Sequence, residues 1–191
     1  MKLSWSHKLF FLINAQIGKR SWLDKLMYFC ASWLIYVLGA VILVWGTFFL
    51  GSYNPSTFIL FFKLLLTSII CGIGLCYVFA VLWRHPRPIR EFPQTKLLLH
   101  TIETWKTFPS DHTTISFIFA FITIIVGVPV LFGILLVLLA SLVAVGRIYV
   151  GVHYPRDIAG GIVVAFVFAL LAKWLLNNVT QPMYDGIKLI F

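Results

Sequence analysis

Long apolar runs without charge alternate with short polar segments along the chain. The first run, from Leu26 to Phe62, is interrupted only by the turn-forming residues Gly51 to Pro55. A second uncharged run, from Thr113 to Gly146, would form one helix of about 50 Å, longer than the hydrocarbon core of about 30 Å. It therefore predicts two helices joined near Gly127 to Pro129. The predicted spans are about 26–50, 57–83, 110–127, 129–148 and 156–176.

These runs favour helices, because the strands of a membrane barrel would alternate apolar and polar residues. Residues 1–21 mix aromatic and aliphatic side chains with lysines, which is typical of an amphipathic helix lying at the membrane interface. The fold class predicted is all-α: a polytopic membrane helical bundle of about five transmembrane helices plus an N-terminal interfacial amphipathic helix. Residues 1–191 are predicted to form a single integral-membrane domain.

Composition supports a membrane protein rather than a soluble one. Hydrophobic residues make up 61% and charged residues 11% of the chain, whereas soluble domains carry about 25% charged residues. The formal net charge is +9, and the basic residues stand between apolar runs. We therefore expect anionic lipid head groups or a phosphorylated substrate as partners, and no nucleic acid. No carboxylate cluster with metal-ligand spacing is visible, so we expect no metal and no cofactor.

Five spans and an interfacial N-terminus place three polar segments on one face of the membrane. These are the N-terminal segment, the 84–111 loop and the 147–157 loop. Twelve of the fifteen Lys and Arg residues lie on this face. By the positive-inside rule alone, the face would be cytoplasmic.

Three clusters of polar residues meet on that face: Arg84 to Pro88, Pro109 to His112, and Arg147 with His153 and Asp157. Arginine binds phosphoryl oxygens in a planar, two-pronged way, and the free N–H groups at a helix start favour an anion. A histidine oriented by a carboxylate can act as a nucleophile. The clusters therefore predict a phosphate-handling site.

Within this site, Asp157 falls in the first turn of the last span, four residues after His153. His112 is a second histidine that could protonate a leaving oxygen. Single histidines at a membrane interface are usually simple anchors, and we interpret His7, His85 and His100 in that way.

The pattern Arg147-x5-His153-x3-Asp157, preceded by Pro109-Ser-Asp-His112 and Arg87-Pro88, resembles the three signature motifs of the type 2 phosphatidic acid phosphatase superfamily. The variant Pro-Ser-Asp-His-Thr and the small size resemble its bacterial undecaprenyl-diphosphatases, which are linked to bacitracin resistance. The resemblance implies a multi-pass plasma-membrane enzyme with an extracytoplasmic site. It would convert undecaprenyl diphosphate to undecaprenyl phosphate and inorganic phosphate, recycling carrier lipid for cell-wall synthesis.

Carried over residue by residue, the resemblance implies a phosphohistidine intermediate on His153, with Asp157 as its orienting partner and His112 as general acid. It implies that Arg87 and Arg147 bind the phosphoryl group. Ser110 would contribute a hydroxyl or a backbone N–H.

Three positions depart from the superfamily pattern. Ala80 stands where the first motif has a lysine, and we hypothesise that Arg84 supplies the missing charge. Asp111 stands where the second motif often has glycine, and its carboxylate would repel a diphosphate unless it were protonated, turned away or paired with a base such as Arg84. Gly146 replaces a serine that often begins the third motif.

Two other interpretations remain open at this stage. The enzyme could act on a different lipid phosphate, such as phosphatidylglycerophosphate or phosphatidate. Alternatively, the protein could bind anionic lipid through its basic face without catalysis. The sequence does not indicate an oligomeric state.

Overall fold

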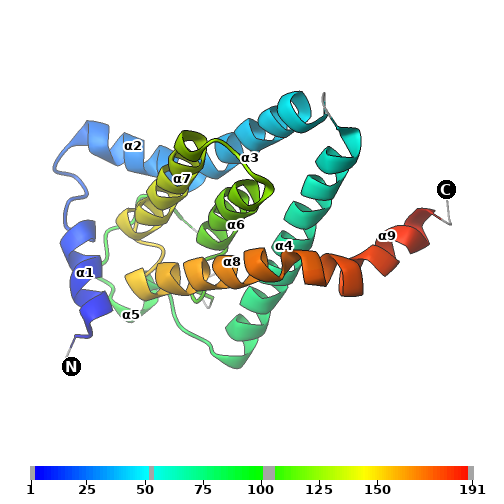
Figure 1. The fold of residues 1–191 in the computed structure, drawn as a ribbon. Coiled ribbons are helices and arrows are strands. Elements are labelled where there is room, and N and C mark those ends of the chain that lie inside the picture. Colours follow the sequence, from blue (N-terminus) through cyan, green and yellow to red (C-terminus); the bar gives the residue numbers. More distant parts are fainter. Residues whose placement is uncertain (1–2, 52–53, 101–105, 189–191) are drawn as a thin grey trace.

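The computed structural model describes residues 3–51, 54–100 and 106–188, and every regular element in these ranges is helical. The predicted all-α membrane bundle is thereby confirmed. Figure 1 shows the helices packed side by side, with α1 and α9 on opposite sides of the molecule. The elements in chain order are α1 (Trp5–Asn14), α2 (Ser21–Ser32), α3 (Leu34–Trp45), the π-helical η1 (Gly46–Gly51), α4 (Pro55–Leu82), α5 (Pro88–Glu91), α6 (Asp111–Val126), α7 (Val130–Tyr149), α8 (Pro155–Leu175), the π-helical η2 (Leu176–Thr180) and α9 (Gln181–Lys188).

Four helical stretches of the described chain are long and apolar enough to cross a membrane, which makes this a multi-pass membrane protein. They are Leu34–Gly51, Pro55–Leu82, Val130–Tyr149 and Pro155–Gly186. The apolar helix α6 has only 16 residues and occupies the place of the span predicted at 110–127. It ends at Gly127, whose φ of 98° lies in the left-handed region that glycine adopts without strain.

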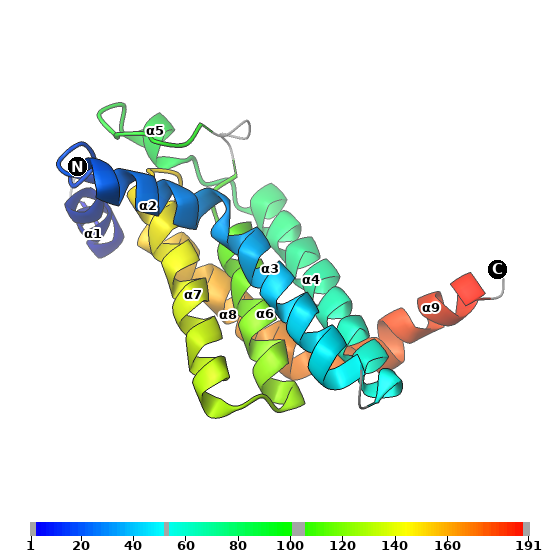
Figure 2. The ribbon, with the colours of Figure 1, turned by 90° about the horizontal axis from the view of Figure 1, so that it is seen from above.

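The first span differs from the one predicted at 26–50. Helix α2 ends at Ser32, α3 begins at Leu34, and the chain changes direction at Trp33 between them, as Figure 2 shows. The reason is tertiary packing. A Cβ atom at Gly146 would lie 2.9 Å from the backbone nitrogen of Ala31, so the missing side chain lets α2 rest directly on α7. This contact holds the end of α2 across the bundle instead of along it.

The N-terminal helix α1 covers the end of the bundle at which α7 ends and α8 begins. The Asn14 side-chain amide donates to the carbonyl oxygens of Lys96 at 2.9 Å and Tyr149 at 3.2 Å. The backbone N–H of Arg156 donates to Ser6 Oγ at 3.2 Å. These bonds tie α1, the 92–100 segment and the start of α8 together.

Helix α6 lies in the middle of the bundle, between α3, α4, α7 and α8 (Figure 2). Ile118 and Ile122 on this helix are fully buried. At its start α6 touches α8 closely, because a Cβ atom at Gly161 would lie 2.9 Å from the carbonyl oxygen of Ser110. The Ser110 N–H also donates to the Asp157 carbonyl oxygen at 3.1 Å, so the second and third polar clusters are joined through the backbone.

Candidate active site

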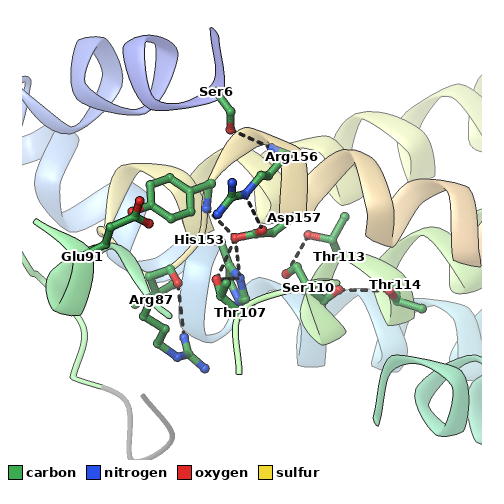
Figure 3. Close-up of polar contacts among 12 residues, drawn as sticks. Ser6, Arg87, Glu91, Thr107, Ser110, Thr113, Thr114, His153, Arg156 and Asp157 are labelled. Carbon is green, nitrogen blue, oxygen red and sulfur yellow. Dashed lines mark hydrogen bonds and ion pairs between the residues drawn. The ribbon is translucent and has the colours of Figure 1, made fainter. Parts of the chain in front are cut away.

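The three polar clusters predicted from the sequence meet at one end of the bundle, around a cavity of about 450 Å³. Figure 3 shows side chains from the 84–111 loop and from the start of α8 pointing toward one another there. Among the described residues, those that line the cavity are Ser32, Arg87, Leu99, His100, Lys106, Pro109, Asp111, His112, Arg147 and His153.

His153 lies in the short connection between α7 and α8. The connection turns at Gly151, whose φ is 89°, and ends where Pro155 starts α8. Only 4% of His153 is exposed. Its Nδ1 atom lies 3.3 Å from Thr107 Oγ1 and 3.6 Å from Asp157 Oδ2. Because Nδ1 faces these two partners, Nε2 is the ring nitrogen left to react.

Asp157 is fully buried, and its carboxylate is held by several donors. Oδ2 accepts hydrogen bonds from Thr107 Oγ1 and from the Tyr154 backbone N–H, each at 2.7 Å. Arg156 Nε lies 3.7 Å from Oδ1. The carboxylate therefore caps the start of α8 and at the same time orients the hydroxyl that contacts His153.

Thr107 was not among the residues predicted for the site. It is buried and bridges His153 and Asp157, as Figure 3 shows. A threonine two residues before Pro109 carries no recognisable sequence signal. Its position becomes meaningful only when the loop is seen folded over the start of α8.

The electrostatic environment of His153 favours a neutral imidazole. Burial lowers the pKa of His153 well below its usual value, and the nearby charges of Arg147 and Arg87 lower this pKa further. Only a neutral imidazole has a lone pair with which to attack. The site thus favours the neutral imidazole of His153, whose lone pair is available.

The two predicted arginines, Arg87 and Arg147, both line the cavity, although 93% or more of each is buried. Arg87 Nη1 donates to the Val152 carbonyl oxygen at 3.3 Å, and Arg147 Nη1 donates to the Ala31 carbonyl oxygen at 3.1 Å. These backbone contacts fix two guanidinium groups beside His153. Fixed guanidinium groups of this kind suit the oxygens of a phosphoryl group.

His112 is the second residue of α6 and lines the same cavity as His153. It belongs to a different helix and a different cluster, so a bound group could lie between the two rings. The other predicted member of its cluster, Ser110, is fully buried and lies outside the cavity lining. Its hydroxyl accepts a hydrogen bond from Thr113 Oγ1 at 3.1 Å, and its backbone N–H donates to the Asp157 carbonyl oxygen, so Ser110 joins the start of α6 to α8.

The ion-pair partner of Asp111 is not the residue hypothesised from the sequence. Asp111 Oδ2 pairs with Lys106 Nζ at 2.7 Å rather than with Arg84. Arg84 is exposed and is not among the described residues that line the cavity. The structure therefore brings Lys106 to the cavity, a residue that was not among those predicted for the site. In the described part of the chain, no group of three His, Cys, Asp or Glu side chains is arranged to hold a metal ion.

The chain is similar to proteins of one known family over most of its length. A family model described as the PAP2 superfamily matches residues 56–181. The undecaprenyl-diphosphatase BcrC of Bacillus subtilis is 27% identical over 190 residues, covering 97% of this chain and 91% of that protein. YbjG of Escherichia coli, provisionally named an undecaprenyl-diphosphatase, is 29% identical over 183 residues, covering 94% of this chain and 87% of that protein.

Among solved structures, the crystal structure of Aquifex aeolicus LpxE has the same fold. It superposes with a TM-score of 0.70 at 24% sequence identity, covering 90% of this chain and 96% of that one. At this identity the likeness concerns the arrangement of helices alone.

Proposed function

The chain belongs to the PAP2 superfamily, and on that premise we propose that it is a membrane lipid phosphatase that hydrolyses undecaprenyl diphosphate to undecaprenyl phosphate and inorganic phosphate. The family match also confirms the resemblance drawn from the three motifs. One observation carries the proposal. Nδ1 of the buried His153 contacts the Thr107 hydroxyl, which donates to Asp157. Two fixed arginines line the same cavity as His153.

The proposed reaction has two steps. In the first, Nε2 of His153 attacks the terminal phosphorus, and the bond from that phosphorus to the bridging oxygen breaks. Undecaprenyl phosphate departs with a proton from protonated His112, and a phosphohistidine remains. Arg87 and Arg147 stabilise the charge on the transferred phosphoryl oxygens.

In the second step, water attacks the phosphohistidine while His112, now neutral, accepts a proton from it. The N–P bond breaks, inorganic phosphate leaves and neutral His153 is restored. Asp157 and Thr107 hold the imidazole in the tautomer whose Nε2 lone pair faces the phosphorus. Each step uses side chains already placed around the cavity, so the proposal needs no metal ion and no cofactor.

The choice of substrate rests on the relatives. Two of them, which match more than nine-tenths of this chain, carry the name undecaprenyl-diphosphatase. We accordingly propose that the protein lies in the plasma membrane with its site on the extracytoplasmic face, recycles carrier lipid for cell-wall synthesis and confers bacitracin resistance. The many basic residues on that face run against the positive-inside rule, and phosphate binding accounts for several of them.

The first test is phosphate release from undecaprenyl diphosphate by the detergent-purified protein in the presence of EDTA. The parent protein is expected to release phosphate, and a His153→Ala variant with the same thermal unfolding curve is expected to release none. Release by His153→Ala at the parental rate would refute the histidine mechanism.

The same assay separates the rival interpretations. Faster hydrolysis of phosphatidylglycerophosphate or phosphatidate than of undecaprenyl diphosphate would keep the phosphatase and change its substrate. Binding of these lipids with no release from any of them would favour a non-catalytic lipid-binding protein.

A further inference from the structure

A buried cation that the mechanism above does not use lies at the edge of the cavity. Lys106 is 3% exposed, and its Nζ atom is 2.7 Å from Asp111 Oδ2 and 3.8 Å from the centre of the Tyr77 ring. Lys106 and Asp111 both line the cavity. The ammonium group is thus held between a carboxylate and an aromatic face, next to the space that a substrate would fill.

Stability alone is a poor reason for this arrangement. Removing the ammonium group of a lysine from water costs free energy that its attraction to a carboxylate often fails to recover. The Asp111 side chain is 33% exposed, so the pair is open on the carboxylate side and is placed to exchange partners. A bound anion could take the place of Asp111 beside Lys106.

Lys106 also lies near the helical position that carries a lysine in the first motif of the superfamily. Its ammonium group lies over Tyr77, and Ala80 follows Tyr77 by three residues on α4, so the two positions share one face of the helix. Ala80 is buried and carries no charge. The 106–109 segment therefore brings a cation to this face of α4 from a different part of the chain.

The surroundings of Tyr77 indicate which end of a lipid substrate Lys106 would meet. Tyr77 is 47% exposed and lines, with Val78, Val81 and Leu82, an apolar groove of about 320 Å³ on α4. Lys106 thus lies between this groove and the polar cavity. An isoprenoid chain lying in the groove would bring its attached phosphate to Lys106, and the outer phosphate would lie deeper, near the arginines.

We propose that Lys106 is a specificity-determining residue that binds the lipid-attached phosphate of a diphosphate, and that Asp111 holds it in position when the site is empty. The inference rests on the proposed function and assigns a cation to the leaving group. As the bridging bond breaks, negative charge grows on the lipid phosphate, and an ammonium group beside it stabilises that charge. A lipid monophosphate whose single phosphate lies between the arginines has no second phosphate for Lys106 to bind, so the residue favours diphosphates.

The test measures binding rather than turnover, so that it stands apart from the hydrolysis assay. Dissociation constants are measured by calorimetry in detergent for two unreactive lipids with the same farnesyl chain, a methylenediphosphonate and a monophosphonate. The variants are Lys106→Gln, Lys106→Arg and the double variant Lys106→Gln with Asp111→Asn. Arg90→Gln is the matched control, because Arg90 is an exposed cation of the same loop.

We expect Lys106→Gln to weaken diphosphonate binding at least about tenfold, the scale of one lost charged hydrogen bond, with monophosphonate binding changed less than about threefold. Lys106→Arg should keep most of the parental preference for the diphosphonate over the monophosphonate, and Arg90→Gln should keep all of it. The double variant leaves no unpaired carboxylate, so its loss of preference should persist.

Recovery of the parental preference in the double variant would overturn the proposal, since Lys106 would then serve only to neutralise Asp111. An equal loss for both phosphonates in Lys106→Gln would overturn it as well. If the parent hydrolyses no lipid phosphate and yet shows the expected binding pattern, the proposed function fails and the phosphate-binding role of Lys106 stands.

Discussion

Replacing Thr107 with valine tests whether its hydroxyl connects Asp157 to His153, the proposed nucleophile. The direct distance from His153 Nδ1 to Asp157 Oδ2 is 3.6 Å, beyond the range of a good hydrogen bond. The two shorter contacts, 3.3 Å and 2.7 Å, both involve Thr107 Oγ1. Valine has nearly the same shape as threonine, so Thr107→Val removes the bridge with little change in packing.

The size of the effect follows from the bond that is lost. At 2.7 Å the contact with Asp157 is a short hydrogen bond to a buried carboxylate, and a net contribution of about 1.5–3 kcal/mol is typical of hydrogen bonds to charged groups. If this free energy serves to orient His153 in the transition state, kcat should fall about 10- to 150-fold. Thr107→Ser keeps the hydroxyl and should stay within about threefold of the parent.

The assay is steady-state release of phosphate from undecaprenyl diphosphate, with thermal unfolding of each variant measured in the same detergent. A double-mutant cycle with Asp157→Asn makes the test stricter, because residues that act as one unit give strongly non-additive effects. Adding Thr107→Val to Asp157→Asn should lower kcat by less than about threefold more. Parental kcat in Thr107→Val, or full additivity with Asp157→Asn, would refute the bridge.

Three further predictions concern the same site. Burial and the two nearby arginines lower the pKa of His153, so its imidazole should stay neutral as the pH falls through 6.5. The acid limb of the pH profile of kcat/KM should therefore lie below pH 6.5. An acid limb at or above pH 6.5 would contradict this prediction. Gly161→Ala places a methyl group against the Ser110 carbonyl oxygen, so it should lower the melting temperature and the activity, since overpacking costs about 1–3 kcal/mol. Gly74→Ala is its control, because a Cβ atom there meets nothing within 4 Å. Prolonged dialysis against EDTA should leave phosphate release unchanged, and restoration of a lost activity by added Mg²⁺ or Zn²⁺ would show a metal requirement.

The long apolar helices could be predicted largely from the sequence, because the uncharged runs and turn residues that indicate them are local features. Uncharged runs longer than a hydrocarbon core must be divided, and Gly127 with Pro129 marks a turn that lies between α6 and α7 in the structure. The change of direction at Trp33 has no such signal. It depends on α2 resting against α7 at Gly146, a contact between residues more than a hundred positions apart.

The same distinction holds for the candidate site. His153 and Asp157 are four residues apart, so the start of α8 brings them together without help from distant parts of the chain. Lys106, Thr107 and Arg84 all lie in an irregular loop, where charge or polarity does not tell which side chains turn inward. In the structure Lys106 and Thr107 are buried at the site, whereas Arg84 is exposed. Only the folded loop shows this difference.

The short length of α6 has a consequence for how a substrate reaches the protein. Helices α6 and α7 have 16 and 20 residues, which correspond to about 24 Å and 30 Å. A turn of only three residues joins them, so the difference of about 6 Å falls at the end that carries Asp111 and His112. The start of α6, which carries two residues of the cavity lining, is therefore set back from the end of α7 by about one helical turn.

A site set back in this way would lie closer to the level of the lipid head groups than a site at the very ends of the helices. A lipid could present its phosphates there while its chain stays in the bilayer, without the free-energy cost of extraction into water. Encounter would then depend on lateral diffusion and on the mole fraction of the lipid in one leaflet. For this protein, the relevant substrate concentration is a surface density.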